Sequence, residues 1–530
     1  MRTAGSYFIR DKAIGFLTAA FFVTVLVTGL LAFDDHGISG DEIVNRNNGI
    51  LAYGYITEAD ESLLSYRDRH YGTFFELPLF MLEKSMGLTD SRRIFLLRHL
   101  ATFMMFFFGL IFFFLLIRRI FSNPVMPLLG SVFLFLSPRI FAHSFYNSKD
   151  IVFMSLYITA AYTLSRFLDK RDMLSGGWHA LACAALMGVR IAGAVVPVLT
   201  AVLYAADRTL RASSGKERRS GHSGMLLFIG LTPILTVLVR PFLWGHPAAR
   251  FTEVLRRMIQ FPWNGTVLYL GRYVHAAELP WHYVPGWMAL TTPLLYLLFF
   301  PPGLMVFPGD IGRNVKDTYG RLRSHIMVLS LFIVPLAGII LSGAVLYDGW
   351  RHMYFIYPMF LIISLRGIDK TFSAVSRIGR KRLRAALKGV MAVIICAALA
   401  VTASRMYRMH PYQNVYFNPI AGAGDELRER FELDYWGLGY REALEHIAGT
   451  DPAGSIPVHV SMFPGGLGRI PALILKEEER KRFVFTDAPS EATYFVTNYR
   501  WHREDYPYEN EMYTVEADGV KIVSVFRLKE

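Results

Sequence analysis

Three carboxylates in one polar segment have the type and placement expected of a catalytic loop at a membrane face. Asp41 and Glu42 follow the first long apolar stretch of the chain by about eight residues, and Glu76 stands within the run Phe-Phe-Glu-Leu-Pro. A carboxylate within hydrogen-bond reach of a hydroxyl can act as a general base. Because a carboxylate among apolar residues needs a cationic partner or takes a raised pKa, Glu76 also suits a functional site. We therefore treat Asp41, Glu42 and Glu76 as candidate catalytic residues.

A structural role would explain the same carboxylates. Aspartate is a favoured N-cap residue, so Asp41 could cap a helix that begins at Glu42. Glu76 would then be an ordinary charge at a membrane interface. The residue types and their spacing leave both interpretations open.

A second group of residues on the same expected face could bind an anion. These are basic or imidazole side chains at the ends of apolar stretches: Arg139, His143, Lys149, Arg190, Arg351 and His352. Short outer loops of membrane proteins normally avoid positive charge, and a guanidinium group suits phosphate oxygens. A phosphate-bearing substrate would explain these residues. Pairing with anionic lipid, or with the nearby carboxylates Asp150 and Asp348, would explain them as well.

Aromatic residues in a long loop before the eighth apolar segment form a third group of candidates. Trp263, Trp281 and His282 lie in this loop. Aromatic side chains stack on apolar faces and also settle at bilayer interfaces. The three residues could line a substrate entrance, or they could be interfacial anchors only.

The elements that must position these residues are membrane helices. Of the 530 residues, 53% are hydrophobic and 19% are charged, which is too apolar for a soluble chain of this size. The net charge of +13 comes from short basic runs between apolar segments, a pattern that indicates membrane topology and gives no sign of a nucleic-acid partner. The two cysteines, Cys183 and Cys396, lie in apolar runs and suggest neither a disulfide framework nor a metal site.

Eleven apolar segments are predicted to cross the membrane. In chain order they are 14–33, 95–117, 126–136, 151–168, two short helices within 178–206 that turn near Arg190, then 225–244, 284–307, 326–347, 354–365 and 389–407. Arg2, Arg10 and Lys12 precede the first segment and place the N-terminus in the cytoplasm. The basic segment 208–219 is then cytoplasmic, and the loops that carry the candidate residues are extracytoplasmic.

Two domains follow from this pattern. Residues 1–407 form the membrane domain, with residues 34–94 as its first outer loop, and residues 408–530 form a soluble extracytoplasmic α/β domain. In the second domain we expect a helix at 440–447 and strands at 456–460, 483–486, 493–497 and 521–526. Asp518-Gly519 predicts a hairpin turn, because this pair tolerates positive φ angles.

The order of these features resembles the GT-C glycosyltransferases, and among them glycosyltransferase family 39 with its relatives, the protein O-mannosyltransferases and the aminoarabinose transferase that modifies lipid A. In that family an Asp-Glu pair opens the first outer loop, and an aromatic-Phe-Glu-Lys-Pro element follows it. Gly40-Asp41-Glu42 matches the first element and residues 74–78 match the second. The resemblance covers about residues 10 to 370. Leu77 departs from the pattern, since the aminoarabinose transferase has a lysine implicated in phosphate binding there, and another cation must take that role.

The resemblance implies a polytopic α-helical membrane protein of GT-C-like fold, with about 11 transmembrane helices and a soluble C-terminal α/β domain. It implies a glycosyltransferase of the plasma (inner) membrane that moves a sugar from a polyprenyl-phosphate donor to a hydroxyl of a lipid, glycan or protein acceptor. Asp41 would be the general base of an inverting attack, and Glu76 would position the acceptor or the donor. Arg139, Arg190 and Arg351 would bind the phosphate. Some relatives use a divalent metal, for which Asp41 and Glu42 are candidate ligands.

Two other functions remain open at this point. A transporter or flippase of a lipid-linked or anionic substrate would also need the cations and the spans, although transporters usually place ionisable residues near the midplane of the membrane. A membrane scaffold that carries a C-terminal binding module would leave Asp41 and Glu76 unexplained. The identity of the sugar and acceptor, the metal requirement, the oligomeric state and the role of the C-terminal domain are not determined by the sequence.

Overall fold

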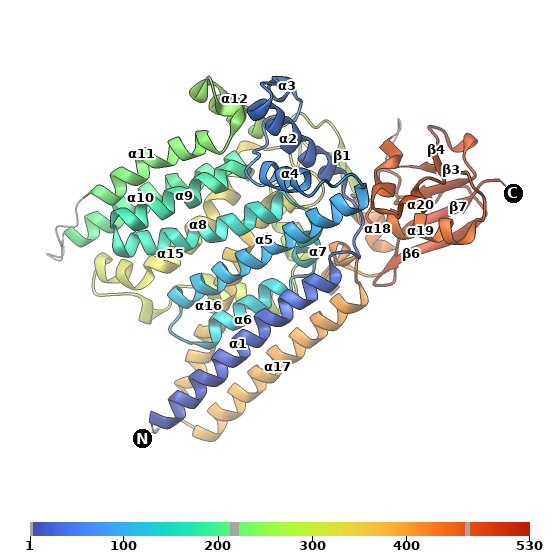
Figure 1. Cartoon of the computed structure of the whole chain (residues 1–530). Coiled ribbons are helices and arrows are strands. Elements are labelled where there is room, and N and C mark those ends of the chain that lie inside the picture. Colours follow the sequence, from blue (N-terminus) through green and yellow to red (C-terminus); the bar gives the residue numbers. More distant parts are fainter. Residues whose placement is uncertain (1–3, 213–221, 462–466, 530) are drawn as a thin grey trace.

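The computed structural model describes residues 4–212, 222–461 and 467–529. Figure 1 shows a bundle of long helices and, at one end of it, a smaller domain that contains the C-terminus. Most of the predicted cytoplasmic segment 208–219 lies outside the described residues.

The described residues contain six helices that are long and apolar enough to cross a membrane. They are α1 (Ala4–Ala32), α5 (Ser91–Ile120), α8 (Asp150–Lys170), α10 (Val195–Ala212), α15 (Val315–Ser342) and α17 (Lys381–Arg408). A seventh span arises if α6 (Val125–Phe135) and α7 (Pro138–Tyr146), which meet at 67°, are counted as one broken crossing. Three shorter apolar helices are α9 (Met173–Val189), α11 (Ser223–Leu238) and α14 (Leu294–Leu304). A polytopic helical protein is therefore confirmed, whereas the count of eleven spans is not.

Prolines explain two breaks in the apolar segments. The predicted span 284–307 is not one helix, because α13 (Tyr283–Thr291) ends before Pro293 and α14 begins after it. The ring of a proline disfavours a helical residue before it, and Thr292 is extended, with φ −97° and ψ 137°. In the same way Ser137, with φ −96° and ψ 101°, separates α6 from the helix that begins at Pro138.

The predicted turn near Arg190 is confirmed. Helix α9 ends at Val189, and a short 3-10 segment, Ile191–Ala194, leads into α10. The predicted span 354–365 begins in a 3-10 segment, Arg351–Ile356, and continues into α16 (Tyr357–Ser376). The polar segment 34–94 is helical for much of its length and contains α2 (Gly40–Thr57), α3 (Ser62–Ser65) and α4 (Glu76–Ser85).

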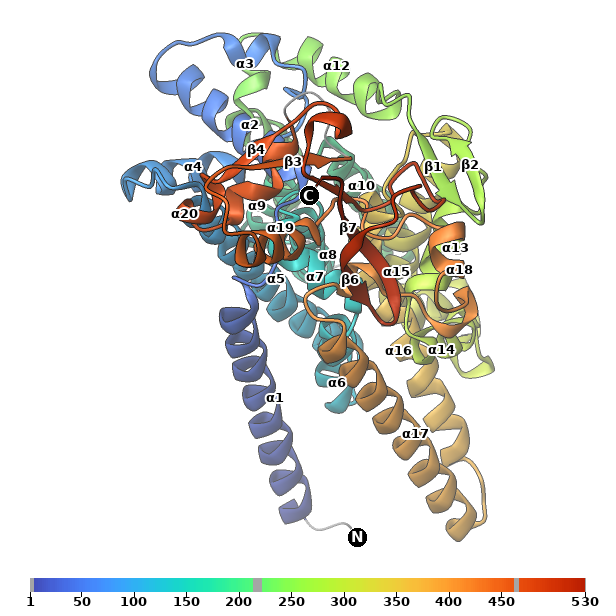
Figure 2. The same ribbon diagram turned by 90° about the vertical axis from the view of Figure 1, so that its right-hand side faces the viewer.

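The long loop before α13 has structure of its own that the sequence did not predict. It contains α12 (Pro247–Ile259) and a hairpin of β1 (Thr266–Tyr269) and β2 (Arg272–His275). In Figure 2, α3, α12 and this hairpin lie at the same end of the bundle as the C-terminal domain.

A five-stranded mixed sheet organises the C-terminal domain. Its strands are β3 (Ile456–Val460), β4 (Phe483–Phe485), β5 (Tyr494–Thr497), β6 (Glu511–Ala517) and β7 (Val520–Arg527), in the spatial order β4-β3-β5-β7-β6. Strand β3 pairs in parallel with β4 and β5, and β7 pairs antiparallel with β5 and β6. The helices are α18 (Glu426–Arg430), α19 (Tyr440–Thr450) and α20 (Glu477–Arg480). The four predicted strands, the helix and the turn are confirmed, and Asp518 and Gly519 have φ angles of 55° and 75°.

Hydrogen bonds and an ion pair hold the C-terminal domain against the end of the bundle that carries α2. Arg441 donates to the backbone carbonyl of His36 over 3.0 Å, and Arg92 donates to the carbonyl of Ile474 over 2.7 Å. Arg405, near the end of α17, pairs with Asp518. The C-terminal domain and the polar segment 34–94 therefore lie at the same end of the bundle.

This arrangement yields a prediction about topology. In a chain with Cys396 replaced by serine, cysteines placed singly at the exposed residues Ser65 and Ser455 should react with a membrane-impermeant thiol reagent in intact cells. A cysteine at Ser376, at the opposite end of α16, should react only after lysis, because basic segments stay on the cytoplasmic side. Labelling of the Ser65 or Ser455 variant only after lysis would contradict the extracytoplasmic assignment.

Candidate active site

The start of α2 leaves the carboxylate of Asp41 available for other contacts. The N-cap residue is Ser39, which is extended with φ −81° and ψ 146°. Its backbone N–H donates to Oε2 of Glu42 over 2.8 Å, which satisfies a donor that the first helical turn leaves unpaired. The interpretation of Asp41 as the cap of a helix that begins at Glu42 is therefore wrong.

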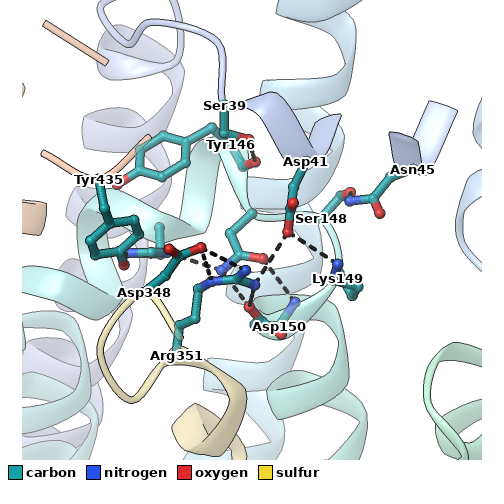
Figure 3. A network of polar contacts seen from close by, with 12 residues as sticks. Ser39, Asp41, Asn45, Tyr146, Ser148, Lys149, Asp150, Asp348, Arg351 and Tyr435 are labelled. Atoms are coloured by element: carbon teal, nitrogen blue, oxygen red, sulfur yellow. Dashed lines mark hydrogen bonds and ion pairs between the residues drawn. The ribbon is translucent and has the colours of Figure 1, made fainter. Parts of the chain in front are cut away.

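Two cations contact one oxygen of Asp41. Oδ2 of Asp41 lies 3.1 Å from Nζ of Lys149 and 3.2 Å from Nη1 of Arg351 (Figure 3). About a quarter of the Asp41 side chain is exposed, whereas the Arg351 side chain is fully buried. Burial alone would raise the pKa of Asp41, but Lys149 and Arg351 outweigh it and hold this pKa well below its usual range. Asp41 is thus an ionised carboxylate between two cations.

Arg351 also joins two further carboxylates. Its Nη1 lies 3.1 Å from Oδ2 of Asp150, and its Nη2 lies 2.9 Å from Oδ2 of Asp348. Arg190 pairs with the other oxygen of Asp150. Arg351 therefore pairs with Asp150 and Asp348, as the alternative interpretation of the sequence expected, and it also contacts Asp41.

The members of this charged cluster come from points where helices begin or end. They are Asp41, Lys149, Asp150, Arg190, Asp348 and Arg351. Lys149 is the N-cap of α8 and Asp150 is its first residue, where the helix dipole favours a carboxylate. Arg190 is extended between α9 and the next 3-10 segment, and Arg351 begins the 3-10 segment before α16. Breaks in the helices therefore bring polar side chains together at the end of an apolar bundle.

A cavity of about 380 Å³ lies beside the cluster. Tyr71, Arg190, Tyr347 and His352 line it, together with apolar side chains from α12 and α15 and from the segments next to them. Nδ1 of His352 is shielded and has no hydrogen-bond partner among the described residues. The cavity thus combines an apolar wall with polar groups, as a site for an amphipathic ligand requires.

Glu76 and Glu42 are buried and have their own partners outside the cluster. Glu76 is buried, pairs with Arg98, and accepts a 2.6 Å hydrogen bond from the hydroxyl of Ser148. The expected cationic partner of Glu76 is therefore Arg98. Glu42 is also buried, and its Oε1 lies 3.0 Å from Nε2 of His99. Both glutamates make structural contacts, and neither lines the cavity.

Arg139 and His143 are both buried. The guanidinium of Arg139 lies 5.2 Å from the ring centre of Trp287 and 4.7 Å from that of Phe417, in the arrangement of a cation–π contact. Nδ1 of His143 lies 3.0 Å from the side-chain nitrogen of Asn147, which in turn donates to Asp150. His143 therefore reaches the cluster through Asn147.

The aromatic candidates separate into two places. Trp263 stacks on Tyr347, with ring centres 4.6 Å apart, and Tyr347 lines the cavity. Trp281 is 70% exposed and its ring lies next to that of His282, whose Nδ1 is 3.1 Å from the hydroxyl of Tyr269. Among the described residues, neither Trp281 nor His282 forms a hydrogen bond or ion pair with Asp41.

Sequence reasoning missed Arg500 and Trp436, which come from the C-terminal part of the chain. The guanidinium of Arg351 lies 4.8 Å from the ring centre of Trp436, and Nη2 of Arg500 lies 2.5 Å from Oδ1 of Asp348. Asp348 can be recognised locally, because the pair Asp348-Gly349 is typical of a tight turn. Both residues have the positive φ angles of such a turn, 58° and 66°. No local feature of the sequence indicates Arg500.

The carboxylates do not gather in the way that a metal site requires. Asp41 contacts two cations, whereas Glu42 contacts Ser39 and His99. Among the residues that the structure describes, no three histidine, cysteine, aspartate or glutamate side chains are grouped to hold a metal ion. The candidate pair Asp41 and Glu42 therefore does not fit a shared metal, and we assign no step to one.

Comparisons with known proteins show the fold. No protein-family model matches the sequence, and no curated protein matches it. The structure is similar to that of ArnT from Cupriavidus metallidurans in the apo state, with a TM-score of 0.52, 12% identity, and coverage of 97% of this chain and 98% of that chain. The corresponding values for ArnT bound to undecaprenyl phosphate are 0.50, 11%, 99% and 98%. ArnT is a GT-C glycosyltransferase, and the predicted resemblance to this group is confirmed at the level of the fold.

Proposed function

We propose that the chain is an integral membrane glycosyltransferase that moves a sugar from a polyprenyl-phosphate donor to an acceptor hydroxyl at the extracytoplasmic face. The observation that carries this proposal is the pairing of Asp41 with Lys149 and Arg351 beside a largely apolar cavity. Transfer from a lipid phosphate needs a base for the acceptor, cations for the phosphate and an apolar cavity for the lipid. The fold of ArnT, one structure of which is bound to undecaprenyl phosphate, supports this class of donor.

The ion pairs give the donor phosphate a second role. Without donor, Asp41 is a weak base, because Lys149 and Arg351 keep its pKa low. A phosphate oxygen competes for the same two cations, since guanidinium and ammonium groups bind phosphate strongly. As these cations turn to the phosphate, the pKa of Asp41 rises toward its usual range and the carboxylate becomes a better proton acceptor. Donor binding thus activates the base.

The transfer step balances without an added reactant. The acceptor oxygen attacks the anomeric carbon while its proton passes to Asp41. The bond from the anomeric carbon to the phosphate oxygen breaks on the opposite side of that carbon, so the configuration inverts. The leaving polyprenyl phosphate keeps the electron pair, and Lys149, Arg190 and Arg351 stabilise its charge. Glu76 pairs with Arg98 and accepts a hydrogen bond from Ser148, and it thereby supports the segment that carries Lys149.

Donor binding is the direct test of this function. The purified protein in detergent should bind undecaprenyl phosphate, because Lys149, Arg190 and Arg351 can form charge-assisted hydrogen bonds with its phosphate. In the same preparation a polyprenyl-phosphate sugar should be consumed only when an acceptor is present. Binding without any transfer, together with movement of the lipid across vesicle membranes, would instead support the transporter or flippase.

A further inference from the structure

Arg500 of the C-terminal domain reaches the cluster of the membrane domain. It follows β5 and projects toward Asp348, while its Nη1 donates to the backbone carbonyl of Tyr435. The residues on both sides of Arg500 have positive φ angles, 60° at Tyr499 and 61° at Trp501. Side chains larger than glycine rarely adopt this conformation, and it persists only where the surrounding structure imposes it. The backbone is therefore strained around the residue that enters the site.

The contacts form a continuous chain of charges. Arg500 lies 2.5 Å from Oδ1 of Asp348, and Oδ2 of Asp348 lies 2.9 Å from Nη2 and 3.2 Å from Nε of Arg351. Nη1 of the same Arg351 contacts Asp41. The side chain of Asp348 is only 4% exposed, so its contacts with both arginines are shielded from bulk water. Arg500 is thus connected to Asp41 through two buried side chains.

The division of Asp348 between two arginines sets the position of Arg351. With one oxygen held by Arg500, Asp348 presents the other oxygen to the Nε and Nη2 edge of Arg351. The Nη1 group then points to Asp41 and Asp150. Without Arg500, a buried carboxylate would lose one of its two cations, and it would draw the guanidinium of Arg351 to itself, because an under-paired buried charge is strongly unfavourable.

Arg500 also changes the charge balance of the site. Lys149, Arg190 and Arg351 are matched one for one by the three carboxylates Asp41, Asp150 and Asp348. Arg500 adds a fourth cation to this group. Two buried carboxyl groups, Glu432 and Asp434, also interact with Arg500: burial raises the pKa of each, and Arg500 lowers it.

We propose that Arg500 is a positioning residue for the donor phosphate, and that through Asp348 it makes the C-terminal domain part of the donor site. This inference rests on the proposed function. The Arg500 side chain does not contact the phosphate itself. It holds Arg351 in the orientation in which Nη1 can pass from Asp41 to a phosphate oxygen.

Another arginine between the domains supplies a matched control. Arg503 donates to the carbonyl of Gly271 in the β1–β2 hairpin over 2.7 Å, and its ion pair is with Glu504 and not with Asp348. It joins the C-terminal domain to the long outer loop as Arg500 joins it to the site. Loss of Arg503 therefore reports on domain contact alone.

The test compares Arg500→Ala, Arg500→Lys and Arg503→Ala in the full-length protein in detergent. We expect Arg500→Ala to weaken binding of undecaprenyl phosphate by about tenfold or more, as for loss of a charged group coupled to a buried ion pair. Arg500→Lys should recover part of the affinity, because the charge remains while the fork is lost. Arg503→Ala should bind as the wild type does. Adding Asp348→Asn to Arg500→Ala should restore affinity in part, since the neutral side chain no longer competes for Arg351.

Three outcomes would overturn the proposal. One is unchanged affinity in Arg500→Ala, and another is an equal loss in Arg500→Ala and Arg503→Ala. The third is retention of the contact between Arg351 and Asp41 in a structure of the Arg500→Ala variant, because the inference requires Arg351 to leave Asp41 and turn to Asp348. This structure tests the inference even if the wild type fails to bind undecaprenyl phosphate, a result that by itself rejects the proposed function.

Discussion

The Asp41→Asn variant should insert and fold as the wild type does but should transfer sugar roughly 100- to 10,000-fold more slowly, the usual contribution of a general base. Asparagine keeps the shape of the side chain and can still accept a hydrogen bond from Lys149. It cannot take up the acceptor proton. Arg351 retains Asp150 and Asp348 as partners, so the buried guanidinium stays paired.

Donor affinity separates this role from a structural one. In the wild type, Asp41 competes with the phosphate for Lys149 and Arg351. The Asn variant removes that competition, so binding of undecaprenyl phosphate should be unchanged or tighter while kcat falls. Asp60→Asn is the matched control, because Asp60 is exposed and bonds with Ser62. Normal turnover in Asp41→Asn would remove Asp41 from the reaction.

The second large effect is expected in Arg351→Ala. Loss of a charge-assisted hydrogen bond to phosphate should weaken donor binding by about 1.5 to 3 kcal/mol, which corresponds to roughly 10- to 150-fold in Kd. Arg351→Lys should fall between the variant and the wild type, because a point charge replaces a bidentate fork.

Stability measurements complete this test. Each carboxylate that contacts Arg351 keeps one other cation, namely Lys149 for Asp41, Arg190 for Asp150 and Arg500 for Asp348. The fold should therefore survive the substitution with a lowered unfolding temperature. Arg69→Ala, which breaks a half-exposed pair with Glu253, should change neither property by much, since such pairs contribute little. If Arg351 serves only in the ion-pair network, Arg351→Ala should lower the unfolding temperature while the affinity for the donor stays at the wild-type value.

Local patterns in the sequence determined the elements of the fold. Apolar stretches of sufficient length predicted the long helices, and short runs rich in residues that favour strands predicted four of the C-terminal strands. Prolines at 138 and 293 end helices through their effect on the residue before them. Such signals act within a few residues, so the sequence alone carries them. For the same reason the resemblance of the motifs around Asp41 and Glu76 to those of the GT-C glycosyltransferases could be noticed in the sequence.

Only the tertiary structure decided which charges meet. Lys149 reaches Asp41 across 108 positions of sequence, and Arg500 reaches Asp348 across 152. It also decided that Ser39 caps α2, and that Trp281 lies away from the cavity that Tyr347 lines. Partners for a charge depend on which faces of distant helices and domains pack together and exclude water, and a one-dimensional pattern does not specify those faces.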